Sequence, residues 1–199
     1  MKLHVLGRSG TCPGPGSACS GYLLQAGGKH ILIDCGSGTL ARLQQILPLE
    51  EIDAIVISHL HYDHMSDIFC LKYALETLIA LGKAIAPIPL LLPASPAALS
   101  SEIASGDLFA VQHIVDGYQA QIVGCTLRFD WMPHLVESYA ITCTCAGAKF
   151  VYSGDTGMND RLVNVARNAD LFLCESTFAS DLDLLASDHH LSAQNAGRI

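Results

Sequence analysis

Several short apolar runs in this chain stop at a histidine or a carboxylate. The run HILI is followed by Asp34, AIVIS by His59, LRFDWMP by His134, FVYSG by Asp155 and LFLC by Glu175. Short apolar runs bounded by turn residues are typical of buried β-strands, and strand ends are where a rigid sheet presents a site. We therefore expect a fold with many short strands whose functional residues lie in the loops just past the strand ends.

Helical patterns alternate with these strands. The segments predicted to be helical are 39–47, 67–81, 95–104 and 160–169. The second of these carries a one-sided apolar stripe, formed by Ile68, Leu71, Leu75, Leu78 and Ile79. Ser95 is expected as the N-cap of the third segment, with Pro96 as its first helical residue. The alternation predicts an α/β fold with many short strands.

The composition indicates one acidic globular domain over residues 1–199. The chain is 50% hydrophobic and has a formal net charge of -8, and its length suffices for one substantial core. Lys72, Glu76 and Lys83 interrupt the most apolar region, 68–99, so no membrane-spanning helix is expected. The N-terminal sequence MKLHVLGRSG lacks the apolar run of a secretory signal, which predicts a cytoplasmic protein.

The eight cysteines show no paired C-x-x-C spacing, and several lie within apolar, strand-like runs. Disulfides and a zinc knuckle are the alternatives, and neither is favoured by this spacing and these apolar surroundings. Buried, reduced thiols are therefore the favoured interpretation.

The stretch SHLHYDH concentrates histidine, which occurs only nine times in the chain. His59 and His61 are separated by one residue, so in an extended backbone both imidazoles point the same way and can bind one metal ion. Asp63 and His64 follow across a turn and can face a second ion. The alternative is a polar loop whose histidines bond to nearby backbone, but this combination of residues is too rare to favour it.

These residues resemble the H-x-H-x-D-H signature of the metallo-β-lactamase superfamily. ILIDCGSGTL is similar to the first motif of that family, with Asp34 supporting the metal loop; MPHLVESYAI and FVYSGDTG are similar to later motifs. CEST followed by HHLSA resembles the ribonuclease Z branch in its short form. The resemblance covers essentially the whole chain and implies a four-layer αβ/βα sandwich with the metals at one sheet edge.

The resemblance also implies a role for each matching residue. His59, His61 and His134 would hold the first metal ion, Asp63 and His64 the second, and Asp155 would bridge the two. His190 matches the histidine that protonates the leaving group, and its neighbour His189 is the lower-ranked alternative. Glu175 is either a partner that orients a histidine or a solvated cap.

The ligand chemistry favours hydrolysis. Imidazoles and carboxylates without a thiolate suit Zn²⁺, which is favoured, and also Mn²⁺. Two ions bridged by Asp155 would share a hydroxide that forms near neutral pH and acts as the nucleophile. Asp63 is expected to coordinate one ion and to orient this hydroxide, and His190 to protonate the departing oxygen.

The family pattern continues past the HLSA helix with one more strand and a final histidine ligand. The sequence stops at AQNAGRI, inside that helix, so we expect the domain to be C-terminally incomplete, without its last strand and helix. An uncovered sheet edge favours pairing with another chain, which makes a homodimer a further hypothesis.

The leading hypothesis is a binuclear phosphodiesterase, either ribonuclease Z-like or acting on a small phosphodiester. The chain has only 11 Lys and Arg, and its glycine-rich N-terminal loop offers only Arg8, which disfavours a large nucleic-acid footprint. A small phosphodiester or a short RNA end fits better. The alternatives are hydrolysis of a carboxylic ester, thioester or lactone by the same superfamily, and a non-catalytic metal-binding module.

Overall fold

The computed structural model describes residues 1–122, 124–180 and 188–199. The chain divides into two compact units, Met1–His113 and Ile114–Ile199. We call them the first and the second unit and describe each by itself. The expectation of a single domain over residues 1–199 stays a prediction.

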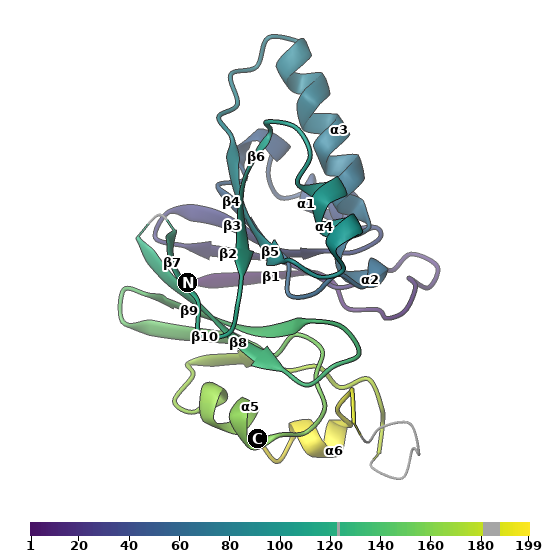
Figure 1. The fold of residues 1–199 in the computed structure, drawn as a ribbon, viewed down its shortest axis with the longest axis vertical. Helices are drawn as coiled ribbons and strands as arrows, with labels where there is room; N and C mark the ends of the chain where they lie inside the picture. Colours follow the sequence, from purple (N-terminus) through teal and green to yellow (C-terminus); the bar gives the residue numbers. More distant parts are fainter. Residues whose placement is uncertain (123, 181–187) are drawn as a thin grey trace. The chain divides into compact units, whose positions relative to one another are not determined.

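The first unit is built on a six-stranded sheet with the strand order β1-β2-β3-β4-β5-β6 (Figure 1). Its strands are β1 (Lys2–Gly7), β2 (Gly21–Ala26), β3 (Lys29–Cys35), β4 (Ala54–Val56), β5 (Ile88–Pro93) and β6 (Phe109–Ile114). The pairs β1–β2 and β2–β3 are antiparallel, whereas β3–β4 and β4–β5 are parallel. Every residue of β4 is buried, as expected for a central parallel strand that is covered on both faces.

The helices of the first unit are α1 (Thr39–Leu43), the 3₁₀ helix η1 (Leu49–Glu51), α2 (Tyr62–Met65), α3 (Asp67–Ala80) and α4 (Ala97–Ile103). The predicted stripe on α3 is confirmed at Ile68, Leu71 and Leu75, which are buried in the core, while Ile79 is 42% exposed. Packing of this stripe against the sheet stabilises a helix that short-range propensity alone would leave marginal.

Several helix boundaries differ from the prediction; the helix expected over 160–169, for example, ends at Ala166. The helix expected over 39–47 ends at Leu43, because Gln45 and Ile46 donate to carbonyls only three residues earlier and Pro48 follows. Ser95 is not the N-cap of α4. Pro96 takes that place with an extended backbone (ψ 132°), and its carbonyl accepts the first helical hydrogen bond, from the Ser100 N–H.

The second unit holds a five-stranded sheet with the order β11-β10-β9-β8-β7. Its elements are β7 (Gln119–Ile122), β8 (Cys125–Met132), β9 (Ser138–Cys145), β10 (Ala148–Tyr152), α5 (Asp160–Ala166), β11 (Leu171–Leu173) and α6 (Ala193–Ala196). The sheet is antiparallel except for β10–β11, which are parallel and joined through α5. The Asn159 side chain caps α5 by accepting from the Leu162 N–H at 2.9 Å.

Five of the eight cysteines are buried, as predicted for those in apolar strands, whereas Cys12 and Cys70 are exposed and Cys174 is half-buried. No helix in the described part of the chain has the length and apolarity needed to span a bilayer.

Candidate metal centre

Asp34, at the end of β3, is a fully buried carboxylate. Its backbone is left-handed (φ 54°), which aspartate tolerates better than most residues. The carboxylate accepts hydrogen bonds from the Ser58 N–H at 2.7 Å, the Ser58 hydroxyl at 2.9 Å and His64 Nδ1 at 2.7 Å. Asp34 therefore fixes the exit of β4 and the orientation of one histidine ring.

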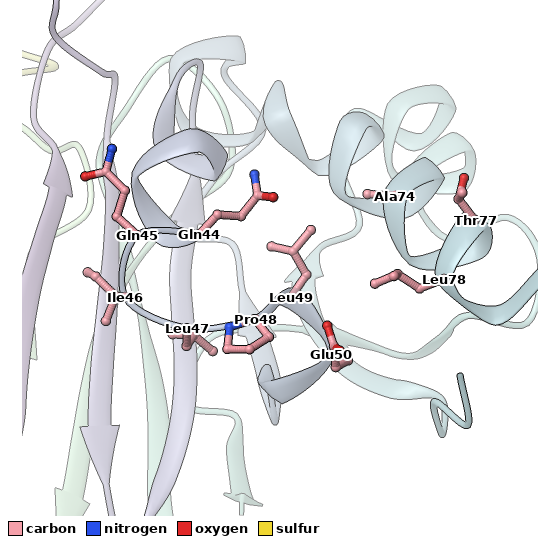
Figure 2. A pocket seen from close by; sticks show the side chains of 10 residues that line it. All are labelled: Gln44, Gln45, Ile46, Leu47, Pro48, Leu49, Glu50, Ala74, Thr77 and Leu78. Atoms are coloured by element: carbon pink, nitrogen blue, oxygen red, sulfur yellow. The ribbon is translucent and has the colours of Figure 1, made fainter. Parts of the chain in front are cut away.

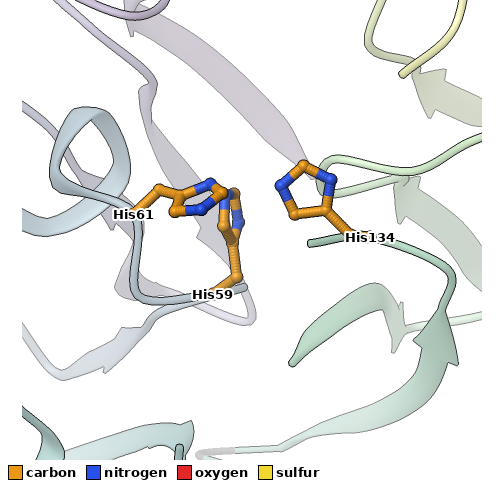
Figure 3. Close-up of side chains that lie close together, drawn as sticks. All are labelled: His59, His61 and His134. Carbon is orange, nitrogen blue, oxygen red and sulfur yellow. The ribbon is translucent and has the colours of Figure 1, made fainter. Parts of the chain in front are cut away.

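The H-x-H-x-D-H segment forms the exit of β4 and the short helix α2. The ring centroids of His59 and His61 lie 4.9 Å apart, and those of His59 and His64 lie 4.0 Å apart. Figure 3 shows the first two rings side by side and also labels His134 of the second unit. The alternating spacing in the sequence thus brings the imidazoles of the first unit together as predicted.

Asp63 joins this group through a close backbone approach. Its Oδ2 lies 3.9 Å from His64 Nε2. Its carbonyl oxygen packs against Gly36, where an added Cβ would come within 1.9 Å of that oxygen. Only glycine leaves room for Asp63 at this place.

In the second unit the loops after β8 and β10 meet the segment before α6. Ligand atoms of His134, Asp155 and His190 all lie within 4.8 Å of one another. His190 Nδ1 is 3.7 Å from Asp155 Oδ2, and the rings of His134 and His190 have centroids 4.9 Å apart. The predicted residues of this unit therefore form one cluster.

Glu175 orients His190. Its carboxylate oxygens accept from His190 Nδ1 at 3.1 and 3.3 Å. Glu175 is itself held by the Thr156 N–H at 2.7 Å and the Thr177 hydroxyl at 2.8 Å. Of the two readings of Glu175, the structure supports the partner that orients a histidine.

Neighbouring histidines 189 and 190 have different surroundings. The His189 carbonyl accepts from His134 Nδ1 at 2.8 Å, while its own side chain is exposed. The His190 ring lies against Asp155 and Glu175. His189 thus contributes a backbone oxygen to the cluster, whereas His190 contributes its side chain.

Four of the imidazoles have Nδ1 engaged by an acceptor: His59 by Ser58 Oγ at 3.0 Å, His64 by Asp34, His134 by a carbonyl and His190 by Glu175. Ser58 Oγ donates to Asp34, so it accepts from the ring beside it. With the proton on Nδ1, Nε2 of His59, His64 and His134 is the atom that would coordinate a metal ion, which is the arrangement usual for metal-ligating histidines. The donor set fits divalent ions.

Two thiols beside the clusters, those of Cys19 and Cys174, have raised pKa values. Burial, and then the Asp63 charge, raise the pKa of Cys19 above its ordinary value. Burial, with the charge of Glu175, raises the pKa of Cys174 to about 12. Neither thiol belongs to the groups of described residues whose ligand atoms lie within 4.8 Å of one another, and these groups contain only imidazoles and carboxylates.

Ser58 is a member of the site that the sequence analysis missed. It connects His59 to Asp34, and its position directly before the histidine motif was the available signal. The histidines judged not to be ligands form other contacts: His4 with Gln25, His30 with the Glu51 carbonyl and His113 with Ser100.

A separate pocket of about 530 Å³ lies in the first unit between α3 and the segment that follows α1 (Figure 2). Its lining residues are Gln44, Gln45, Ile46, Leu47, Pro48, Leu49, Glu50, Ala74, Thr77 and Leu78. None of the predicted site residues, all of which the structure describes, is among them. The pocket is therefore separate from the candidate metal ligands of the first unit.

Comparison with known families decides the relationship. The model of the metallo-β-lactamase superfamily matches residues 14–194. The chain belongs to the metallo-β-lactamase superfamily. The predicted fold is thereby confirmed, and this membership together with the clustered histidine and aspartate donors supports a metal-dependent hydrolase.

Three relatives illustrate the range of similarity. The probable metallo-hydrolase YhfI of Bacillus subtilis is 32% identical over 100% of this chain and 81% of its own length; its crystal structure, at 30% identity, gives a TM-score of 0.93 over 98% of this chain and 79% of that one. Ribonuclease Z of Bradyrhizobium is 27% identical over 100% of this chain and 85% of its own. Human tRNase Z, short form, shares the fold, with a TM-score of 0.80 at 21% identity over 100% of this chain and 87% of that one.

Proposed function

We propose that this chain is a binuclear metal-dependent phosphodiesterase. The observation that carries the proposal is the second-unit cluster, in which Glu175 holds a histidine beside Asp155. A histidine supported by a carboxylate at Nδ1 is suited to give a proton from Nε2 to a departing oxygen. The similarity to ribonuclease Z supports a phosphodiester as substrate.

The ligand set follows the family resemblance. His59, His61 and His134 would hold one ion, Asp63 and His64 the other, and Asp155 would contact both. Zn²⁺ is the first choice and Mn²⁺ the alternative. When bound, the ions would supply an activated water and positive charge against the phosphoryl oxygens.

Other steps of the proposed reaction would depend on residues of the chain itself. Asp34 and Ser58 keep the ligand rings of the first unit in one orientation. Asp63 would accept a hydrogen bond from the attacking water and direct its lone pair toward phosphorus. His190 would donate its Nε2 proton to the leaving oxygen, and Glu175 would stabilise the ring in its charged form beforehand.

A small phosphodiester or a short RNA end is the proposed substrate class. The net charge of -8 weakens the attraction to long polyanions, because affinity for nucleic acids comes mainly from basic side chains that contact phosphates. A cytoplasmic location and a homodimer stay predictions.

The test combines metal analysis with turnover. The purified chain should bind two equivalents of Zn²⁺ or Mn²⁺ by elemental analysis and should hydrolyse bis(p-nitrophenyl) phosphate with the loaded metal. p-Nitrophenyl acetate, a thioester and a lactone serve as comparison substrates. Faster cleavage of any of these would favour the carboxylic-ester reading, and bound metal without turnover of any substrate would favour a binding module.

A further inference from the structure

Gly157 lies where three loops of the second unit meet. Its N–H donates to the Pro133 carbonyl at 3.0 Å, next to His134. Its own carbonyl accepts from the Asn159 amide at 2.8 Å and from the Thr156 hydroxyl at 2.9 Å. The residue is buried, and it follows Asp155 closely in the chain.

The segment before α6 packs directly on this glycine. A Cβ added at Gly157 would lie 2.3 Å from the Asp188 carbonyl oxygen, 2.7 Å from the carbonyl carbon and 3.2 Å from the His189 nitrogen. All three atoms belong to the backbone, so no side-chain rotation could relieve the overlap. The φ angle of Gly157 is outside the left-handed range, which means that space, and not backbone conformation, requires glycine here.

The backbone that would have to move carries two groups of the cluster. The His189 carbonyl fixes the ring of His134, and His190 follows directly with its ring held on Glu175. Glu175 in turn accepts from the Thr156 N–H, one residue before the glycine. A displacement of the Asp188–His190 backbone would therefore separate the His190 ring from the carboxylates that orient it.

We propose that Gly157 is a positioning residue for His190: its missing side chain lets the Asp188–His190 backbone approach closely enough to place the proton donor beside Asp155 and Glu175. This inference rests on the proposed function for its kinetic consequence. Its structural consequence, the altered place of the His190 ring, does not depend on any activity.

The kinetic test compares leaving groups. p-Nitrophenolate departs readily without a proton, whereas phenolate needs one, so loss of a general acid should affect methyl phenyl phosphate more than methyl p-nitrophenyl phosphate. Gly157→Ala should lower kcat on the phenyl ester about 100-fold, the lower end of general-acid contributions, and much less on the nitrophenyl ester. The double variant Gly157→Ala/His190→Ala should be no slower than His190→Ala alone, because both changes remove the same step.

Gly197→Ala is the matched control, since its added Cβ would meet only ordinary contacts, the nearest at 3.4 Å. Asn159→Ser is a milder second variant. Serine can still cap α5, but the hydrogen bond from the Asn159 side-chain amide to the Gly157 carbonyl is lost. It should show a smaller rate loss with the same preference for leaving groups, which keeps the inference testable if Gly157→Ala does not fold.

A measurement that does not depend on turnover separates the positioning role of Gly157 from the proposed phosphodiesterase activity. In ¹⁵N NMR spectra of the full chain, Gly157→Ala should shift the amides of His189 and His190 and the ring nitrogens of His190, and Asn159→Ser should shift them less. Unchanged signals would overturn the role of Gly157, as would equal rate losses on both esters. Shifted signals in a chain that cleaves neither ester would uphold the positioning role and overturn only the phosphodiesterase proposal.

Discussion

The deep set, formed by Asp34, His59 and His64 of the first unit, and the shallow set, formed by Asp155, Glu175 and His190 of the second unit, are buried to different depths. Asp63 of the first unit lies outside the deep set, because its side chain is 14% exposed, like that of Asp155. In the first unit His59 and Asp34 are fully buried and His64 is 2% exposed. In the second unit the side chains of His190 and Asp155 keep 24% and 14% of their surface exposed. The deep set is rigidly bonded through a buried carboxylate, as suits holding ions, and the shallow set has the access to solvent and substrate that proton transfer requires.

The largest difference in metal content and activity should appear between two alanine variants of the shallow set. Asp155→Ala removes the residue proposed to contact both ions, so metal and activity should be lost together. His190→Ala removes only the proposed proton donor, so the metals should remain while kcat falls about 100-fold or more. Elemental analysis and steady-state kinetics check both; if His190→Ala also empties the site, its assignment as proton donor is wrong.

The deep set should matter most for stability. Asp34→Ala leaves the Ser58 N–H, the Ser58 hydroxyl and His64 Nδ1 without their acceptor, which should lower the free energy of unfolding by about 3 kcal/mol or more. Glu175→Ala is the counterpart in the shallow set and should cost less, about 1–2 kcal/mol, because only the Thr156 N–H is left buried without its acceptor, while water can reach Thr177 and His190. Urea unfolding measures both, and equal losses would contradict the contrast in depth.

A smaller loss is expected at the glycine beneath Asp63. Gly36→Ala forces the Asp63 backbone away and should cost about 1–3 kcal/mol, as overpacking usually does. Gly14→Ala is the control, because an added Cβ there meets nothing within 4 Å. Thermal unfolding of the two variants compares them, and equal midpoints would show that the loop accommodates the extra methyl group.

The smallest effect should come from buried thiols on the sheet of the second unit. Burial raises the pKa of Cys143 to about 11 and that of Cys125 to about 12, from an ordinary value of 9.0. Above pH 9 the unfolded chain loses these protons before the folded chain does, so stability should fall as pH rises from about 9 toward 11. Urea midpoints at pH 8, 9.5 and 10.5 measure this, and Cys143→Ala should flatten the decline.

The sequence predicted the local parts of this site and missed the parts that depend on packing. The spacing of His59, His61 and His64 is a local pattern, so it sufficed to predict that their rings gather. The link through Ser58 required the position of β3 beside β4. The close approaches at Gly36 and Gly157 involve segments distant in the chain, and no periodicity reports them.

The same division applies to the fold. Long periodic segments such as α3 were predicted almost to the residue, because the helical spacing of their apolar residues can be recognised in the sequence. The C-terminal end of α1 and the N-cap of α4 were predicted wrongly, since both depend on which carbonyl accepts the last or first hydrogen bond. The family resemblance of HHLSA favoured His190 over His189 as the proton donor. The structure adds a physical reason, because the His190 side chain lies against Asp155 and Glu175.

The parallel pairing of β10 with β11 sets how Asp155 and Glu175 lie with respect to each other. Tyr152 pairs with Leu173, and beyond that pair the Ser153 N–H donates to the Leu173 carbonyl and the Ser153 hydroxyl accepts from the Glu175 N–H. The register of two strands, and not the length of the connection between them, therefore fixes the spacing of the two carboxylates. Residues inserted after the end of α5 and before β11 should therefore leave the spacing of Asp155 and Glu175 unchanged. A probe or a second module attached in this connection should not disturb the proposed proton donor.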